Sequence, residues 1–119
     1  MSLSDPALSS APWYAIQVAH RAEAVVATAL RNKGYPEFLP LYRSRRVWSD
    51  RIVEHDLPLF PGYVFCRFHP HDRRVPIVTT PGVRRIVSFG GAPIPVDEAE
   101  IAAVQAILAS GLPPPRVPI

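Results

Sequence analysis

The sequence predicts an α+β domain in which helices flank a four-stranded antiparallel sheet. Two observations lead to this class. Stretches with the two-residue periodicity of strands alternate with stretches of helical periodicity. The order is strand, helix, strand, hairpin, strand, short helix, strand, helix, which gives helices to pack on an antiparallel sheet. At 119 residues, with 48% hydrophobic residues, the chain fits one compact domain with a core of its own.

Composition excludes several classes of protein. No apolar run approaches the ~20 residues of a membrane helix, and no signal-peptide pattern opens the chain, so we expect no membrane contact. The single cysteine, Cys66, cannot form an internal disulfide, which fits a reducing cytoplasm. The net charge of +3 permits contact with nucleic acid without requiring it. Twelve of the thirteen basic residues are arginine, which suits phosphates and carboxylates but is equally explained by the base composition of the genome.

The first third of the chain contains one strand and one helix. Residues 1–12 are small and polar and are expected to be a disordered lead-in. Residues 13–19 are apolar and β-prone, which predicts the first strand. Residues 21–33 carry apolar side chains at helical spacing, and Gly34 follows as a C-terminal cap, so a helix is predicted there.

The middle of the chain predicts a hairpin between two strands. Residues 37–47 form a strand interrupted at Pro40, and Ser49-Asp50 make a turn that begins a short hairpin or loop. Residues 63–68 give the strongest strand pattern. One face of this strand carries Tyr63, Phe65 and Arg67, and the other carries Val64, Cys66 and Phe68.

The last third predicts a short helix, a strand and a long helix. Residues 69–80 contain Pro70, Asp72 and Pro76, which favour a short, irregular helix. A turn at 80–82 leads into a strand at 83–89 and a Gly-Gly loop. Asp97 is the N-cap of the final helix, with Glu100 three residues on. Its predicted buried stripe is Ile101, Val104, Ile107 and Leu108.

Two boundaries complete the predicted organisation. Gly111 ends the final helix, so the domain spans 13–110, and the proline-rich residues 111–119 are typical of a linker. The order of elements is close to the ferredoxin-like pattern.

Catalytic and metal sites find little support. Cys66, His55, His69 and His71 are zinc-ligand types, but their spacing matches no common ligand pair, and Cys66 alternates onto an apolar face. No nucleophile elbow or glycine-rich phosphate loop is present. A small hydrolase of ferredoxin-like fold needs a glycine-rich anion loop after the first strand, where this chain reads VAHRAE. We therefore expect no enzymatic activity, no metal and no cofactor.

The stretch LPLFPGYVFCRF, at 57–68, concentrates aromatic residues around a backbone break. Phe60 precedes Pro61-Gly62, and Tyr63 and Phe65 follow it. If these rings are core, each contributes about 1.5–3 kcal/mol to folding. If they lie in an exposed hollow, they mark a binding site. The general tendency of aromatic residues to be buried slightly favours the core.

The arginines give a second candidate function, a free-standing module that binds nucleic acid without sequence preference. Adjacent arginines occur at 45–46, 73–74 and 84–85, but neighbours on a strand face opposite ways, so a solvated surface explains them as well. Arg31 and Lys33, at the end of the first helix, are candidates for a phosphate-facing rim.

Four motifs together give the chain a family resemblance. They are Trp13-Tyr14, LFPGYVF at 59–65, TPGV at 80–83 and FGGAPIPVDEAEI at 89–101. In this order and spacing the chain resembles the N-terminal domain of NusG-like transcription elongation factors over residues 13–110. The segment 48–65 is most similar to specialised paralogues, the UpxY-type antiterminators of polysaccharide operons, which are relatives of RfaH.

The resemblance implies a site for RNA polymerase. In this family a hydrophobic hollow takes the tip of the clamp helices of the largest subunit, and the domain bridges the cleft and increases processivity. It places Phe60, Tyr63 and Phe65 in the hollow, with Trp13 or Tyr14 beneath or beside them. The implied protein is a monomer without a cofactor.

The resemblance also implies contacts with DNA and a further domain. The non-template strand of the transcription bubble would meet Arg31, Asn32, Lys33, Thr79 and Thr80. Many relatives carry Asn where this chain has Thr79, and the histidine-threonine pattern that RfaH carries near Arg73 and Arg74 is missing, which weakens inherited base preference and any contact with the opposite polymerase pincer. The family usually adds a C-terminal KOW barrel, so we expect the natural protein to continue past Ile119.

Overall fold

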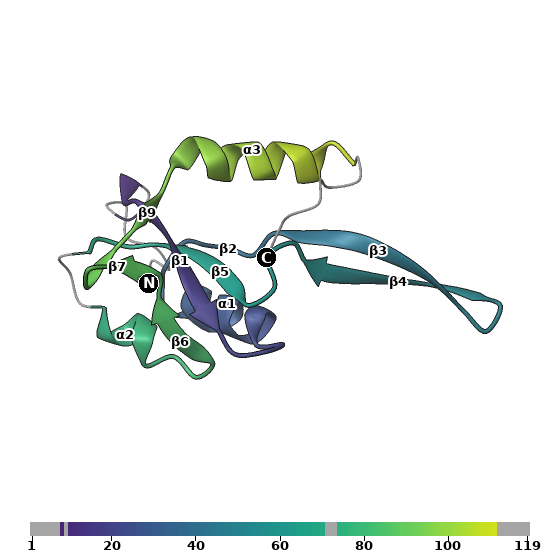
Figure 1. Ribbon diagram of the computed structural model, residues 1–119, viewed down its shortest axis with the longest axis horizontal. Helices are drawn as coiled ribbons and strands as arrows, with labels where there is room; N and C mark the ends of the chain where they lie inside the picture. The colour runs from purple at the N-terminus through teal and green to yellow at the C-terminus, as the bar shows by residue number, and fades with distance from the viewer. Residues whose placement is uncertain (1–7, 9, 71–73, 112–119) are drawn as a thin grey trace.

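The structure is a computed structural model that describes residues 8, 10–70 and 74–111 (Figure 1). Most of the expected lead-in, Asp72, Arg73 and the linker after Gly111 lie outside the described residues. The elements in chain order are β1 Trp13–Val18, α1 Glu23–Asn32, β2 Glu37–Phe38, β3 Leu41–Trp48, β4 Arg51–Pro58, β5 Tyr63–Arg67, α2 Val75–Val78, β6 Val83–Ile86, β7 Ser88–Phe89, β8 Ala92–Pro93, β9 Pro95–Val96 and α3 Glu98–Ala109.

The central sheet confirms the predicted α+β class with antiparallel strands. Its order is β2-β5-β1-β6, and β9 adds a fifth, short strand against β1. β5 pairs with β1 along nearly its whole length, from Trp13↔Arg67 to Gln17↔Tyr63. On its other edge β1 pairs first with β9 and then with β6. The centre of the sheet is therefore β1, the strand with the strongest burial.

The strand predicted at 83–89 is in fact two strands. β6 ends at Ile86, and β7 pairs with β8 in a separate small hairpin around Gly90 and Gly91, which both have positive φ. Val87 lies at the break, where its N–H donates to the carbonyl of Ala15 and its carbonyl accepts from the N–H of Ile94. The Gly-Gly turn reverses the chain, and β9 then returns to the edge of β1.

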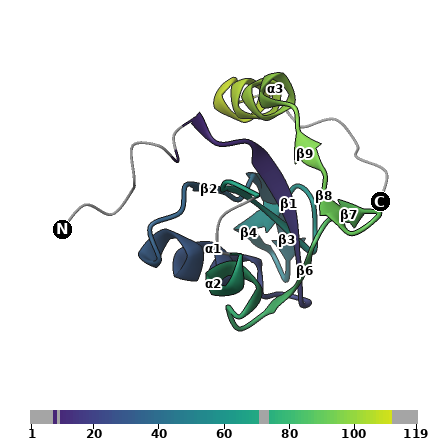
Figure 2. The same ribbon diagram turned by 90° about the vertical axis from the view of Figure 1, so that its left-hand side faces the viewer.

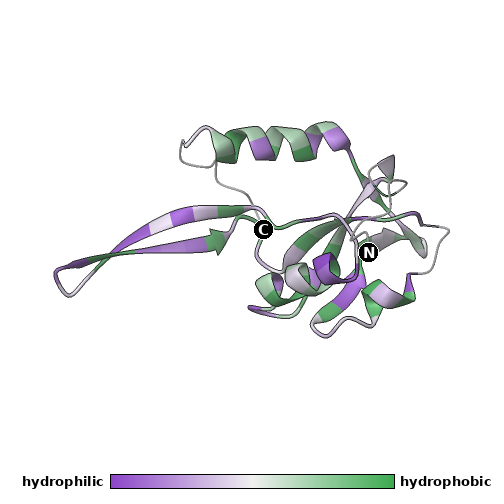
Figure 3. Ribbon diagram, turned by 180° about the vertical axis from the view of Figure 1, so that it is seen from behind, coloured by the Kyte–Doolittle hydropathy of each residue, from purple (hydrophilic) through white to green (hydrophobic). Residues whose placement is uncertain are grey.

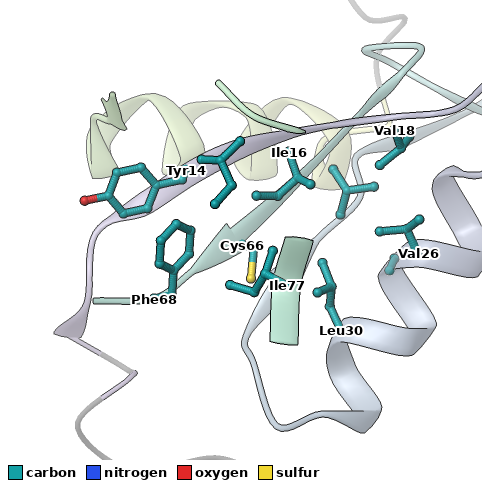
Figure 4. Close-up of a cluster of buried hydrophobic side chains, with 11 residues drawn as sticks. Tyr14, Ile16, Val18, Val26, Leu30, Cys66, Phe68 and Ile77 are labelled. Atoms are coloured by element: carbon teal, nitrogen blue, oxygen red, sulfur yellow. The ribbon is translucent and has the colours of Figure 1, made fainter. Parts of the chain in front are cut away.

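The core lies between the sheet and two helices, α1 and α2, which cover one face (Figures 1 and 2). Alternate residues of β1 and β5 point toward these helices, as strand geometry requires. Figure 4 shows this cluster. Its buried members are Tyr14, Ile16, Val18, Val26, Ala27, Leu30, Val64, Cys66, Phe68, Ile77 and Ile86.

Of the two helices that cover this face, α1 begins later than the sequence pattern predicts, whereas α2 agrees with it. Helix α1 begins at Glu23 rather than at residue 21, because Arg21 has a φ of +62°, outside the helical range. Helix α2 is a single turn with Pro76 near its start, as expected for a short helix containing proline.

Helix α3 lies over the opposite face of the sheet (Figure 2). The predicted N-cap is confirmed, since the Asp97 carboxylate accepts a hydrogen bond from the N–H of Ala99 at 3.4 Å. The predicted buried stripe is only partly correct: Ile101 is buried, whereas Val104, Ile107 and Leu108 are half-buried. Ile101 is the single buried residue of α3, although apolar residues occur along the whole helix (Figure 3).

The chain directly before the first strand is bonded to the central sheet. Ala11 is 1% exposed, and its carbonyl accepts a hydrogen bond from Nη1 of Arg67 at 2.8 Å. The carbonyl of Pro12 accepts from the N–H of Phe68 at 3.3 Å. These bonds attach Ala11 and Pro12, the last residues of the expected lead-in, to the end of β5.

The β3–β4 hairpin projects from the body of the molecule and lengthens it to 52 Å (Figure 1). Its eight residue pairs run from Leu41↔Pro58 to Trp48↔Arg51. Ser49 and Asp50 form the predicted turn, with φ of 47° and 65°. Positive φ at both turn residues is the geometry of the two-residue turn that suits the twist of a hairpin.

Candidate functional site

Four aromatic rings form a row on the face of the sheet that α3 covers, opposite the core. The ring centroids of Trp13 and Phe38 lie 6.5 Å apart, those of Phe38 and Phe65 6.3 Å, and those of Phe65 and Phe60 5.7 Å. We call these four residues the aromatic row. Strand register explains the arrangement: Phe65 pairs with Phe38 on one side and with Ala15 on the other, and Trp13 shares the face of Ala15.

The aromatic row is partly open to solvent. Trp13 is 7% exposed, and the guanidinium of Arg67 lies over its ring, 4.7 Å from the centroid. Phe38, Phe60 and Phe65 are half-buried, as is the neighbouring Tyr63. The sequence left two alternatives for these rings, burial in the core or exposure in a hollow. In the structure their exposure is intermediate. Trp13 is the covered end of the row, and the phenylalanines present ring surface beside it.

The Pro61-Gly62 break is a tight turn that orients the row. The N–H of Tyr63 donates to the carbonyl of Phe60 at 3.1 Å, and Gly62 has a φ of +87°. Proline followed by a glycine of positive φ is the pattern of a type II turn. The turn lies between the end of β4 at Pro58 and the start of β5 at Tyr63, and Phe60 and Phe65 meet edge to face across it.

A buried carboxylate holds this turn against the body of the protein. Oε2 of Glu23, the first residue of α1, accepts a hydrogen bond from the N–H of Gly62 at 2.8 Å, and Glu23 is 8% exposed. On the other side the carbonyl of Gly62 accepts from the N–H of Val18 at 2.9 Å. Sequence reasoning missed Glu23, because an acidic residue in the first turn of a helix is common and only the fold brings it to residue 62.

Tyr14 does not join the aromatic row. It is 3% exposed and lies in the core, on the other face of β1, with its ring centroid 4.4 Å from that of Phe68. Burial raises the pKa of its hydroxyl above the ordinary value of 10.0. Of the two residues expected beneath or beside the hollow, Trp13 lies beside the phenylalanines, and the placement of Tyr14 in the predicted polymerase-binding set is corrected.

The residues expected to meet DNA gather where α1 and α2 approach one another. Nζ of Lys33 donates to the carbonyl of Pro76 at 2.6 Å and to Oγ1 of Thr80 at 2.8 Å. The Thr80 hydroxyl donates in turn to the carbonyl of Pro76, and Thr80 is 2% exposed. Lys33 and Thr80 thus hold α2 against the end of α1. A buried hydroxyl engaged in this way is not placed to contact a strand of DNA.

The other expected DNA contacts remain on the surface. Arg31 is exposed and pairs with Glu37, with 3.1 Å between Nε and Oε2. Asn32 and Thr79 are also exposed. The Arg31 side chain is 61% exposed, so its guanidinium group faces solvent although its partner Glu37 is largely covered.

Cys66 is a buried part of the core, as its alternation predicted. Burial, with a smaller contribution from Glu37, raises the pKa of its thiol to about 12, which opposes the thiolate that metals and nucleophilic chemistry require. Within residues 8, 10–70 and 74–111, no three histidine, cysteine or acidic side chains gather closely enough to hold a metal ion.

Comparison with protein families agrees with this architecture. The sequence model of the family described as "Transcription termination factor nusG" matches residues 11–105, most of the chain. The chain belongs to the NusG family. The matched region starts at Ala11, whose carbonyl accepts the hydrogen bond from Arg67 on β5.

A solved structure shows the same fold. The NusG-family chain is similar to the structure described as "Domain interaction in Thermotoga maritima NusG", with a TM-score of 0.61 and 25% sequence identity. The alignment covers 87% of this chain and 59% of the Thermotoga maritima chain. Among the helices of the described residues, none has the length and apolar character needed to cross a membrane.

Proposed function

We propose that this NusG-family domain is a transcription elongation factor domain that binds RNA polymerase and carries no catalytic activity of its own. The observation that supports this best is the aromatic row, a partly open apolar surface on a rigid sheet. Aromatic residues in a half-covered hollow are typical anchors of protein interfaces. Family membership supports RNA polymerase as the partner.

The proposed contact is with the tip of the clamp helices of the largest polymerase subunit. An apolar helix tip fits a groove through a few deep anchors. Phe60 and Phe65 are held by their mutual edge-to-face packing, and the Pro61-Gly62 turn fixes their separation. A surface ordered in this way loses little side-chain entropy on binding, which favours affinity.

Binding to the clamp would act on transcription by shifting the equilibrium between the open and closed clamp. A domain that bridges the cleft fits the closed clamp better than the open one, and it therefore stabilises the closed state. A closed clamp disfavours pausing and so increases processivity. No cofactor takes part in this mechanism.

A second contact, with the non-template DNA strand, is proposed at the exposed end of α1. Arg31, Asn32 and Thr79 are exposed members of the expected set. Lys33 is exposed too, but its ammonium group is bonded to Thr80, which is buried. Arg31→Gln is therefore expected to weaken binding to a polymerase complex with a full bubble and to leave binding to isolated clamp helices unchanged. Equal weakening of both would contradict a role in DNA contact.

Within the family we propose a specialised antiterminator of the UpxY or RfaH type. The support is the segment 48–65, which forms β4 and the start of β5, and whose sequence resembles these paralogues. The test is single-round transcription with polymerase from the same organism. The proposal expects more read-through at terminators and shorter pauses when the protein is added, and increased termination would contradict it.

The decisive experiment is a titration of the protein against an isolated clamp-helix fragment of RNA polymerase. Phe65→Ala is expected to lower the affinity by at least about 30-fold, or about 2 kcal/mol, because it removes the ring at the centre of the row. The matched control is Phe89→Ala, which removes an 81% exposed ring from β7. The control is expected to bind like the wild type.

Three results would separate the readings of the aromatic row. Loss of binding in Phe65→Ala with an unchanged melting temperature supports the proposed site. A large fall in melting temperature with unchanged binding would show that Phe65 serves the core alone. Binding that naked DNA displaces would instead support the nucleic-acid-binding module.

A further inference from the structure

The β3–β4 hairpin carries its charges on two chemically different faces. In an antiparallel pair, residues directly opposite each other project to the same side, and successive pairs alternate between sides. The register Arg45↔Glu54 and Arg46↔Val53 therefore assigns the adjacent Arg45 and Arg46 to opposite faces.

The first face is electrically balanced, and we call it the paired face. Arg43 contacts both acids, with 3.2 Å from Nη1 to Oε2 of Glu54 and 3.3 Å from Nε to Oδ1 of Asp56. Arg45 lies 3.7 Å from Oε1 of Glu54. Two arginines thus neutralise two carboxylates along the strands.

The second face has no acid on either strand, and we call it the basic face. Its pairs are Tyr42↔Leu57, Ser44↔His55, Arg46↔Val53 and Trp48↔Arg51. No ion pair involves Arg46 or Arg51 among the described residues. Asp50, in the turn, is the nearest acid in the sequence. Arg46, Trp48, Val53 and His55 line a shallow hollow here.

The exposure of this face has no structural explanation within the domain. Trp48 is 67% exposed at the end of a ribbon that extends away from the body (Figure 1). Its side chain does not contribute to the core, which lies at the other end of the molecule. The composition of residues 41–58 hides the asymmetry, because four arginines and three acids give the segment a net charge of only +1.

We propose that the basic face of the β3–β4 hairpin binds the phosphate backbone of duplex DNA. Arg46 and Arg51 are diagonal neighbours across the strands, with Cα atoms about 7–8 Å apart, so their guanidinium groups can meet separate phosphates. Guanidinium groups suit phosphate oxygens in geometry and charge. Trp48, opposite Arg51 on the same face, adds apolar surface for a sugar or base edge.

The shape of the hairpin favours duplex DNA over RNA. A two-stranded β-ribbon fits the major groove of B-DNA, which is about 12 Å wide. The major groove of an RNA duplex is deep and narrow and excludes such an element. With two arginines as the main contacts, affinity for naked DNA is expected to be weak and strongly dependent on salt.

This surface is separate from the aromatic row. The basic face belongs to β3 and β4, beyond the sheet, whereas the row spans β1, β2 and β5. The proposal goes beyond clamp binding and does not depend on it. The two activities can therefore be lost independently.

The test is a fluorescence anisotropy titration of the whole chain with a labelled 20-base-pair duplex between 50 and 200 mM salt. Arg46→Gln with Arg51→Gln is expected to reduce the affinity at least about tenfold at 50 mM salt, and to reduce the slope of log affinity against log salt by about 2. The matched control, Arg43→Gln with Arg45→Gln, removes the same charge from the paired face and is expected to change the affinity less than threefold.

Each other outcome overturns the proposal. Equal losses in the two double variants would show attraction by net charge alone. Equal or tighter binding of a single strand or of duplex RNA would show that the basic face prefers another nucleic acid. Absence of DNA binding by the wild-type protein would refute the proposal. Both variants are also titrated with the clamp-helix fragment. Unchanged binding there shows that they are folded, and it separates failure of this proposal from failure of the proposed function.

Discussion

At the scale of single residues, two glycines with positive φ decide how the chain turns near the site. Gly62 has open space where a Cβ would lie, so Gly62→Ala adds only backbone strain and is expected to cost about 1–2 kcal/mol. At Gly82 a Cβ would lie 2.9 Å from Cγ2 of Val26, in addition to an unfavourable φ of +96°. Gly82→Ala is therefore expected to destabilise the protein more than Gly62→Ala. Urea unfolding measures both, and the reverse order would contradict the explanation.

The buried thiol of Cys66 links stability to alkaline pH. Its pKa is raised from 9.0 to about 12, so the folded protein keeps a proton that the unfolded chain loses above pH 9. The stabilisation is complete below pH 9 and declines as pH rises toward 12, by up to about 1.4 kcal/mol per pH unit. The urea midpoint at pH 8 and pH 10 tests this. Cys66→Ala is expected to show a shallower decline, and an equal decline would assign the effect to other groups.

At the scale of elements, one arginine joins three parts of the fold. Arg67, on β5, donates to the carbonyl of Ala11, lies over the ring of Trp13 and pairs with Glu98 at the start of α3. Arg67→Ala leaves the buried Ala11 carbonyl without this donor, which is expected to cost roughly 1–3 kcal/mol. Glu98→Ala removes only a largely exposed carboxylate and is expected to cost less than about 1 kcal/mol.

Hydrogen exchange of the amides in α3 distinguishes these variants. Arg67→Ala is expected to speed exchange in the first turns of α3 more than in α1, because it removes a link between α3 and the sheet. Equal acceleration in both helices would indicate a general loss of stability instead.

The elements that sequence periodicity predicted are those whose signal is local. The alternation in β1 and β5 and the helical spacing of α1 lie within single segments, and the predicted elements formed there. The break at Val87 and the pairing of β9 depend on contacts between distant segments, and they were missed. The same limit explains Tyr14: alternation separates Trp13 from Tyr14, but only the pairing Ala15↔Phe65 shows which of them faces Phe65.

The site was predicted in part for a similar reason. Phe60 and Phe65 flank the Pro61-Gly62 turn, which can be recognised in the sequence, and both were predicted as site residues for that reason. Phe38 lies in the aromatic row because β2 pairs with β5, which places it opposite Phe65, 27 residues later in the sequence. Glu23 contacts Gly62 because α1 packs against the sheet. Neither contact leaves a pattern in the sequence.

At the scale of the whole molecule, the hairpin and the body are expected to be separable. Replacing residues 45–54 by Asn-Gly connects the pair Ser44↔His55 with a two-residue turn and preserves the alternation of faces. None of the deleted residues is in the core, so the melting temperature is expected to change by only a few degrees. The shortened protein should bind the clamp-helix fragment and lose DNA binding, and loss of clamp binding would show that the two surfaces are coupled.

The edges of the central sheet also determine how readily a strand from another molecule can pair with it. At one edge β2 has two residues, flanked by Pro36 and Pro40; at the other, β6 stops at Ile86 and β9 begins with Pro95. An edge that is short and interrupted by proline offers few free N–H groups to a strand from another molecule. The prolines at these two edges thus hinder the addition of a foreign strand to the central sheet, even though its surface carries exposed aromatic rings.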